Sequence, residues 1–245
     1  MEARKAKLRK EGKSDALDRR EVPLSAISPA LVTAVLAAED SRFFDHHGVD
    51  WQAVREAAEW NRTVARKRGR WKRGASTITQ QLAKNLWLSG ERTWWRKGRE
   101  AAIALALDAL VPKKKILERY LSAIEWGERI FGAEAAARKY FGIPAAHLDA
   151  AQAAWLAAMI PNPAFYLARP GRHRQRAAII AARAFGPAAA ARASRSSLER
   201  RWAALKSSEA LVTFIVQRSG SQRLLESQKA AISPWGSVTG FSAQA

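Results

Sequence analysis

Long alanine- and leucine-rich stretches run through this 245-residue chain, and few runs look like strands. Between residues 116 and 124 the apolar side chains recur at helical spacing, and residues 150–160 read as a second, buried helix. Such stripes form the core of a protein far more often than a binding surface. The sequence therefore predicts a mainly α fold with one sizeable core, which a chain of this length is able to bury.

Basic residues outnumber acidic ones by 42 to 22, which gives a net charge of +20. Such a field suits nucleic acid, anionic lipid or an anionic substrate. The densest basic block is 66–73, and Trp60 and Trp71 lie close to it, a mixture that suits a bilayer interface. No nucleic-acid-binding motif accompanies the block, so no nucleic acid is expected as a partner. The absence of cysteine removes any disulfide argument and is compatible with a periplasmic setting.

The run 39–48 places an acidic pair, Glu39 and Asp40, between an apolar-rich segment and the aromatic pair that starts at Phe43. A carboxylate beside apolar residues holds its proton more tightly, which suits a group that exchanges protons near neutral pH. The alternative is a helix C-terminus followed by a solvated turn.

A second polar run covers residues 73–86, where Gly, Ser and Thr indicate a loop that enters a helix N-terminus. Free backbone N–H groups and the helix dipole favour an anion at such a place. A helix that starts near Ser76 puts Thr77, Gln81 and Lys84 on one face, which would suit a phosphate. The alternative is an ordinary capped surface helix.

In a third run, Arg92, Arg96 and Glu100 are spaced i, i+4 and i+8, so a helix aligns two guanidinium groups with a carboxylate. The alternative is a common salt bridge on a solvated face. Two carboxylates, Glu39 and Glu100, with Lys and Arg between them nonetheless fit sugar transfer from a phosphate leaving group. One carboxylate would activate a hydroxyl while the cations neutralise the departing pyrophosphate.

These three runs, in this order, resemble the motifs of the peptidoglycan glycosyltransferase (transglycosylase) family. The family patterns are E-D-x-x-F-x-x-H-x-G, R-G-G-S-T-x-T-Q-Q and R-K-x-x-E, and they match residues 39–48, 73–81 and 96–100. Ile124-Glu-Trp-Gly127 and Pro161-Asn-Pro163 most resemble the monofunctional biosynthetic branch. The resemblance covers residues 22–185 and implies a lysozyme-like helical glycosyltransferase domain. It leaves a basic N-terminal segment, 1–21, and a C-terminal tail of unclear structure, 186–245.

The resemblance implies a role for each matching residue. Glu39 would be the base that deprotonates the sugar 4-hydroxyl of lipid II, and Glu100 the second essential carboxylate. The growing glycan would be attacked at its anomeric carbon and would lose undecaprenyl pyrophosphate with inversion. Lys84 and Arg96 would hold the pyrophosphate. The remaining residues would line the donor site (Ser76, Thr77, Gln81, Asn85) or position the base and its loop (Asp40, Phe43, His46).

Three positions depart from the family pattern. Ala75 stands where a second glycine is usual and stiffens the loop, and Ser122 takes the place of an asparagine. Gln152 replaces a frequent glutamate, so an ion pair at that position is lost. None of these departures touches Glu39, Glu100 or the two cations.

The resemblance also implies a setting and partners. We expect lipid II and the growing glycan chain as substrates, the periplasmic face of the bacterial cytoplasmic membrane as the location, and cell-division or elongation proteins as candidate partners. Members of the family normally carry an N-terminal transmembrane anchor, and no such segment is visible here. No cofactor is required, although Mg²⁺ or Mn²⁺ held loosely near the pyrophosphate is compatible with the family. Adjacent histidines such as His46 and His47 are more often structural than metal ligands, so no metal site is assigned.

Two other functions compete with synthesis. A lytic, lysozyme-like hydrolase would cut the same polymer with a glutamic acid and water, but it has no need for the phosphate site of Lys84 and Arg96. A basic membrane- or nucleic-acid-binding protein without catalysis would not need both carboxylates and both cations at motif spacing. The sequence therefore favours the polymerising transferase.

Overall fold

Helices account for most of the chain that the computed structural model describes, which covers residues 18–65, 74–88 and 93–193. The basic block 66–73, Arg92 and almost all of the two predicted end segments lie outside these ranges. The helices longer than five residues are α2 (Pro29–Glu39), α3 (Trp51–Trp60), α5 (Ile78–Trp87), α6 (Trp94–Leu110), α7 (Lys113–Ala123), α8 (Ala133–Phe141), α9 (Ala150–Met159), α11 (Pro170–Phe185) and α12 (Pro187–Ala193). The shorter ones are η1 (Leu24–Ala26), η2 (Asn61–Ala65), η3 (Ala145–His147) and α10 (Pro163–Leu167).

Three very short strands form one small sheet with the order β1–β3–β2. Strand β1 (Asp18–Arg19) runs parallel to β3 (Ile130–Phe131), and β2 (Glu125–Gly127) is antiparallel to β3. The predicted mainly α fold is therefore confirmed, and the sheet is only a minor addition to it.

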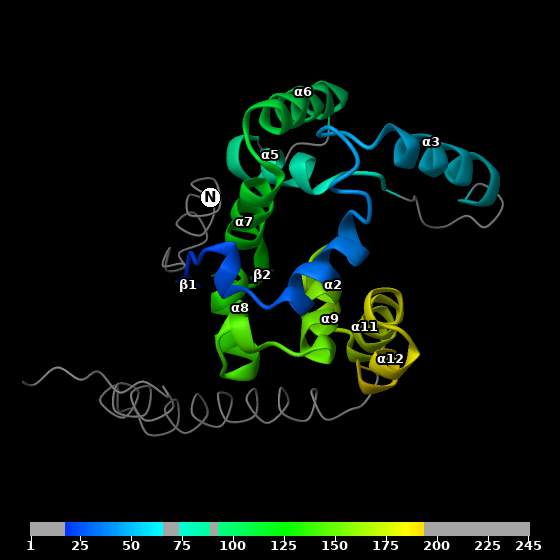
Figure 1. The fold of residues 1–245 in the computed structure, drawn as a ribbon. Helices are drawn as coiled ribbons and strands as arrows, with labels where there is room; N and C mark the ends of the chain where they lie inside the picture. Colours follow the sequence, from blue (N-terminus) through cyan, green and yellow to red (C-terminus); the bar gives the residue numbers. More distant parts are fainter. Residues whose placement is uncertain (1–17, 66–73, 89–92, 194–245) are drawn as a thin grey trace, which may run out of the picture. The chain divides into compact units, whose positions relative to one another are not determined.

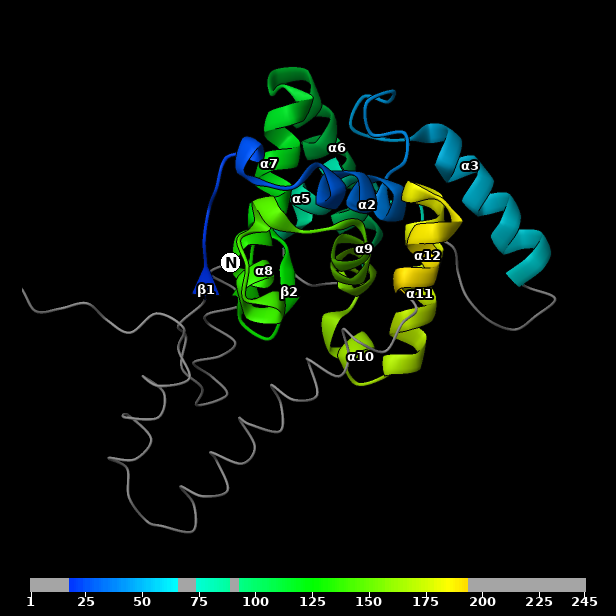
Figure 2. The same cartoon turned by 60° about the horizontal axis from the view of Figure 1, so that its bottom comes forward.

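The buried core lies where α9 packs against α2 and α11, as Figures 1 and 2 show. Every residue of α9 from Ala153 to Met159 is buried, so this helix has no solvent face over that length. Its many alanines let the neighbouring helices approach closely. Asp149 and Gln152 form a reciprocal capping box at the start of α9, so the glutamine found in place of glutamate still serves as a helix cap. The buried helix predicted at 150–160 is confirmed.

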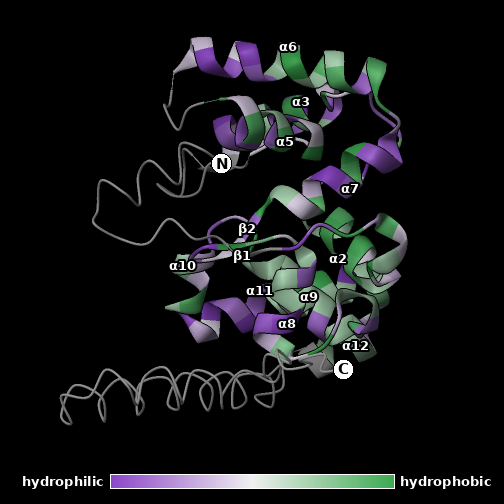
Figure 3. Ribbon diagram, turned by 90° about the vertical axis from the view of Figure 1, so that its left-hand side faces the viewer, coloured by the Kyte–Doolittle hydropathy of each residue, from purple (hydrophilic) through white to green (hydrophobic). Residues whose placement is uncertain are grey.

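A second group consists of α5, which packs against both α6 and α7. Helix α7 buries Ile116, Leu117, Tyr120 and Leu121, which confirms the predicted apolar stripe. Helix α6 behaves differently, because only Glu100 and Ala104 of its 17 residues are buried. Figure 3 shows apolar stretches of α6 at the edge of the molecule. None of the helices in the described ranges is long and apolar enough to cross a bilayer.

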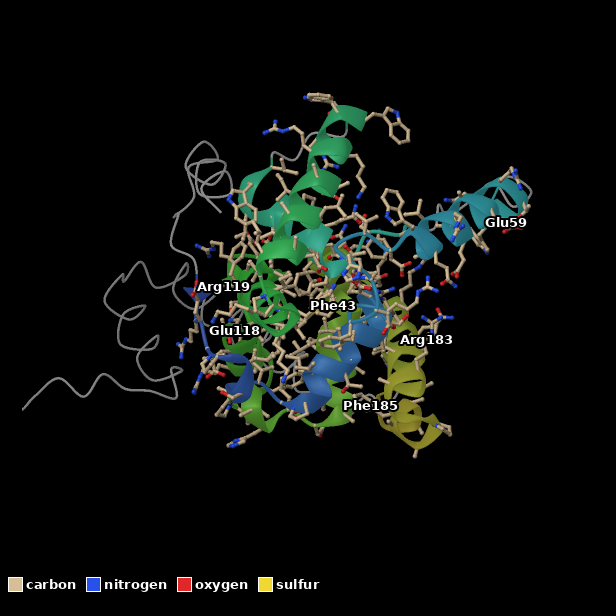
Figure 4. The ribbon with its side chains drawn as sticks, turned by 45° about the horizontal axis from the view of Figure 1, so that its top comes forward. Phe43, Glu59, Glu118, Arg119, Arg183 and Phe185 are labelled. Carbon is tan, nitrogen blue, oxygen red and sulfur yellow. The ribbon has the colours of Figure 1, made fainter. Side chains whose placement is uncertain are left out.

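The loop 40–50 leaves the end of α2 and is held against the second group. Gly48 has φ +75°, and a Cβ atom there would lie 2.5 Å from the carbonyl oxygen of Ala104 in α6, so only glycine fits. The Thr77 hydroxyl donates to the Gly48 carbonyl oxygen over 2.6 Å. Phe43 is buried in the interior (Figure 4), and the Lys113 ammonium lies 4.7 Å from the centre of its ring. The loop therefore connects the two helix groups in a fixed conformation.

Candidate active site

Glu39 is the last residue of α2, and only 11% of its side chain is exposed. Its Oε2 accepts a hydrogen bond from Gln81 Nε2 at 3.0 Å, and its Oε1 accepts one from Arg176 Nη2 at 3.1 Å. Burial raises the pKa of Glu39, and the hydrogen bonds from Gln81 and Arg176 only partly offset this rise. The carboxylate is therefore a better proton acceptor than a solvated glutamate, as a general base requires.

A buried tyrosine fixes the amide that faces Glu39. The Tyr120 hydroxyl donates to Gln81 Oε1 at 3.0 Å, which leaves the Gln81 amino group to point at Glu39. Burial raises the pKa of Tyr120 well above its usual value, so the hydroxyl keeps its proton and remains a donor. Residues from three helices, α2, α5 and α7, thus form one hydrogen-bonded chain that ends on the base.

Asp40 follows α2 in the chain, and its carboxylate lies against the start of α5. It accepts a hydrogen bond from the Ile78 backbone N–H at 2.9 Å, and it lies 3.0 Å from His46 Nε2. Helix α5 begins at Ile78, slightly later than the predicted start near Ser76. Thr77 is its N-cap and is buried, with its hydroxyl bonded to both Gly48 and Gln80. The start of α5 is therefore already occupied by the Asp40 carboxylate of the protein itself, and the roles of Asp40 and His46 in positioning Glu39 and its loop stay predictions.

Glu100 is buried on α6 and lies at the centre of a cluster with the partly exposed Arg96 and Lys97. Its Oε2 accepts from Arg96 Nη1 at 2.6 Å, and its Oε1 accepts from the Lys97 ammonium. Arg96 and Glu100 thus lie on one stripe of the helix, as the spacing predicts, and they form the ion pair that the alternative interpretation expected, with a buried carboxylate in place of a solvated face. Lys97 also donates to Ser76 Oγ at 2.8 Å, which joins α6 to the loop before α5. The cluster carries two cations for one carboxylate and so retains net positive charge.

Lys84 and Asn85 occupy the turn of α5 that follows Gln81. Lys84 is exposed and forms no ion pair within the described ranges, and Asn85 is half-buried. Both side chains are available to an incoming ligand, so their roles at the pyrophosphate and the donor site stay predictions.

A cavity of about 440 Å³ lies beside Glu39, within the size range of small-molecule sites. Its lining comes from the end of α2 with Glu39, the following loop and α3, the loop 74–77, and two arginines of α11, Arg176 and Arg183. The cations of α6 do not line it, but Ser76 in its wall contacts Lys97, so the Arg96–Lys97–Glu100 cluster lies directly behind this wall. The cavity can hold a sugar whose hydroxyl meets Glu39.

Sequence reasoning missed the roles of three residues that complete this arrangement: Lys97, Tyr120 and Arg176. Lys97 is three residues before Glu100, so helical spacing alone offered a signal for it. Tyr120 belongs to the apolar stripe of α7, and the spacing of that stripe does not indicate that its hydroxyl donates to Gln81. Arg176 lies 137 residues from Glu39 in the chain, and no local pattern connects the two.

No group of three or more metal-ligating side chains occurs within the part of the chain that the structure describes. Asp40 and His46 are bonded to each other and to α5 rather than arranged around a common centre. The expectation of loosely held Mg²⁺ or Mn²⁺ stays a prediction.

Comparison with known proteins identifies the family of this chain. The transglycosylase family model matches residues 5–185. The biosynthetic peptidoglycan transglycosylase of Rhodospirillum centenum is 56% identical over 147 residues, which cover 60% of this chain and 62% of that protein. Those of Bordetella pertussis (52% identity, 69% and 68% covered) and Nitrosospira multiformis (51%, 68% and 70%) are similar. The match thus spans somewhat less than two thirds of the first relative and somewhat more of the other two. These matches confirm the predicted family and enzyme class, and the chain belongs to the transglycosylase family of glycosyltransferases.

Proposed function

We propose that this protein polymerises lipid II into glycan strands during bacterial cell-wall synthesis and releases undecaprenyl pyrophosphate. The family match and the names of the relatives support the reaction class. The observation that carries the proposal is the position of Glu39, a desolvated carboxylate in a cavity whose wall contacts the Arg96–Lys97–Glu100 cluster. A base and a cationic site for a leaving group are the two requirements of glycosyl transfer from a pyrophosphate.

The first half of the reaction uses the base. Glu39 takes the proton of the acceptor 4-hydroxyl as the hydroxyl oxygen forms a bond to the anomeric carbon of the growing glycan. The bond from that carbon to the pyrophosphate oxygen breaks, and its electron pair leaves with the pyrophosphate. Attack from the face opposite the leaving group inverts the anomeric configuration. Each Glu39 oxygen accepts one hydrogen bond and keeps a further lone pair, so the acceptor hydroxyl can bind the carboxylate while Gln81 and Arg176 stay in place.

The second half of the reaction concerns the leaving group. Arg96 and Lys97 carry more positive charge than Glu100 neutralises, and Lys84 adds an exposed ammonium on the neighbouring helix. These cations would stabilise the negative charge that develops on the pyrophosphate. Glu100 holds Arg96 and Lys97 in place through one hydrogen bond each, so its role is to orient the cations. A hydrolase that cuts between two sugars releases no phosphate and gains nothing from this cluster.

The exposed aromatic residues of α6 support a location at the periplasmic face of the cytoplasmic membrane. Trp94 and Trp95 are 93% and 79% exposed, and Leu110 at the other end of α6 is 83% exposed. Tryptophan prefers the interface between lipid and water, where its ring is buried while its N–H stays hydrated. A lipid-linked substrate would reach the site from this side. Association with cell-division or elongation proteins stays a prediction.

Polymerisation of labelled lipid II in detergent micelles tests the proposal. Glu39→Gln removes the proton acceptor at nearly the same size and should lower the rate about 10²- to 10⁴-fold. Glu59→Gln, which changes an exposed carboxylate on α3 (Figure 4), is the matched control and should keep the full rate. The phosphoglycolipid inhibitor moenomycin should block the wild-type reaction. Near-normal polymerisation by Glu39→Gln would exclude Glu39 as the base, and a folded wild-type protein that forms no polymer would exclude the proposed function.

A further inference from the structure

A second hollow, of about 530 Å³, lies between the end of α2 and the helices α10 and α11. The lining residues that matter for its chemistry are Ala38, Phe165, Tyr166, Arg172, Arg176 and Arg183. Figure 4 labels Arg183 on α11. The mechanism described above uses only Arg176 among these side chains, so the rest of the hollow has no assigned role.

The lining of the hollow is cationic and apolar at the same time. Three arginines line it together with two aromatic rings and the isoleucines of α11, and no Asp or Glu is among its lining residues. The Arg176 guanidinium lies 5.8 Å from the centre of the Tyr166 ring, and its buried Nε has no hydrogen-bond partner within the described residues. Planar guanidinium groups match carboxylates in a bidentate geometry, and the aromatic and aliphatic surfaces suit small apolar groups. The complementary ligand carries carboxylates and short apolar side chains.

This hollow adjoins the cavity of Glu39. Ala38, Arg176 and Arg183 line both, and Ala38 directly precedes the base in the chain. A ligand in the hollow is therefore part of, or directly beside, the molecule that reacts at Glu39.

We infer that the hollow binds the carboxylate-bearing peptide of the muramyl sugar at the reaction centre, an inference that rests on the proposed function. The substrate has two kinds of anionic group, its pyrophosphate and its peptide carboxylates. The cations of α5 and α6 face the pyrophosphate in the mechanism above, which leaves the α11 arginines for the peptide. The peptide is attached to a sugar that takes part in the new bond, so it emerges within about one sugar ring of Glu39.

Arg172 is the residue for a test, because it lines the hollow but not the cavity of Glu39. Arg172→Glu should raise the KM for lipid II with free peptide carboxylates about five- to tenfold with little change in kcat. The KM for lipid II whose peptide carboxylates are amidated should stay the same in both proteins. Arg55→Glu, the same charge change on an exposed position of α3 outside both hollows, controls for the loss of net charge. Equal effects of Arg172→Glu on both substrates, or on neither, would overturn the inference.

A binding measurement separates this inference from the proposed function. The soluble muramyl pentapeptide, which has neither lipid nor pyrophosphate, should shift the NMR resonances of α10 and α11 in the wild type. The affinity obtained by titrating these shifts should fall at least about fivefold for Arg172→Glu, and equally for the wild type with the amidated peptide. If the protein binds the muramyl pentapeptide in this way but makes no polymer, the proposed function is refuted and the inferred peptide site is supported. Polymerisation without any such binding would refute the peptide site alone.

Discussion

The two helix groups that meet at Glu39 each contain one helix that differs sharply from the other in its burial. In the group of α2, α9 and α11, α9 is buried from Ala153 to Met159. In the group of α5, α6 and α7, α6 buries only two residues and exposes its largest side chains. The first group provides the carboxylate of Glu39 and the Arg176 guanidinium that donates to it, and the second provides the Gln81 amide and the cations that surround Glu100.

This difference indicates a division of labour. A rigid group holds the base in a fixed position, because displacement of α2 would disturb the close packing with α9. In the proposed function, the other group would present the exposed side chains of α6 to lipid and the charges of the Arg96–Lys97–Glu100 cluster to a lipid-linked leaving group. Substitutions that affect only one group, or only the contact between them, test whether the division is real.

The largest expected effect is on the stability of the rigid group. Leu156 on α9 is fully buried, so Leu156→Ala should lower the free energy of unfolding by about 2 to 5 kcal/mol. Urea denaturation followed by circular dichroism measures this loss. Leu110→Ala in α6, where the leucine is 83% exposed, should change stability by less than about 0.5 kcal/mol. A similar loss in both variants would remove the contrast between the groups.

The next effect concerns the surface of α6. Replacement of both Trp94 and Trp95 by serine should lower the affinity for anionic lipid vesicles at least about tenfold. The reason is that each aromatic side chain that enters the lipid contributes about 1.5 to 3 kcal/mol to binding. Vesicle co-sedimentation measures the affinity, and the urea midpoint should stay unchanged. Unaltered vesicle binding would show that α6 is not the membrane-facing surface.

The pH dependence of activity tests the contact between Glu39 and α11. Arg176 stabilises the ionised form of Glu39, so its removal should raise the pKa of Glu39 further. The base works only when deprotonated, and Arg176→Gln should therefore move the acid limb of the kcat/KM profile up by about one pH unit. Arg55→Gln leaves Glu39 untouched and should leave the profile in place. An acid limb that moves down in Arg176→Gln would contradict this assignment.

The smallest effect separates orientation of the base from stability. Tyr120→Phe removes the hydroxyl that fixes the Gln81 amide. It should lower the free energy of unfolding by about 1 kcal/mol and raise the activation free energy by about 1 kcal/mol, a roughly fivefold loss of kcat. Tyr140→Phe is a matched control, because the buried Tyr140 hydroxyl donates to the Trp126 carbonyl oxygen, away from the site. It should cost similar stability with kcat unchanged. Equal kcat losses in both variants would reduce Tyr120 to a structural role.

Local patterns in the sequence were sufficient for some of the helices and for the alignment of residues within one helix. The buried helix at 150–160 and the alignment of Arg96 with Glu100 follow from helical spacing, and the structure confirms both. Contacts between distant elements could not be derived in this way. The hydrogen bonds of Glu39 to Gln81 and Arg176 join residues 42 and 137 positions apart, and they exist only because the end of α2 meets α5 and α2 packs against α11.

The start of α5 shows a different limit of sequence reasoning. A Ser-Thr pair before a helix is equally compatible with an open anion site and with a satisfied cap. The choice depends on Asp40, a residue from the preceding loop whose carboxylate accepts from the Ile78 N–H. The position of the Asp40 carboxylate depends on the conformation of the loop 40–50. This conformation requires a glycine at position 48, because the backbone there approaches α6 closely.

The two hydrogen bonds that Glu39 accepts limit how its carboxylate can turn. Gln81 Nε2 binds one oxygen and Arg176 Nη2 binds the other, and these two donors belong to different helices, α5 and α11. The lone pairs that remain on the two oxygens therefore have fixed directions. An incoming hydroxyl meets a carboxylate that is already oriented, so the entropy cost of ordering this group falls on the fold and not on the encounter with a substrate.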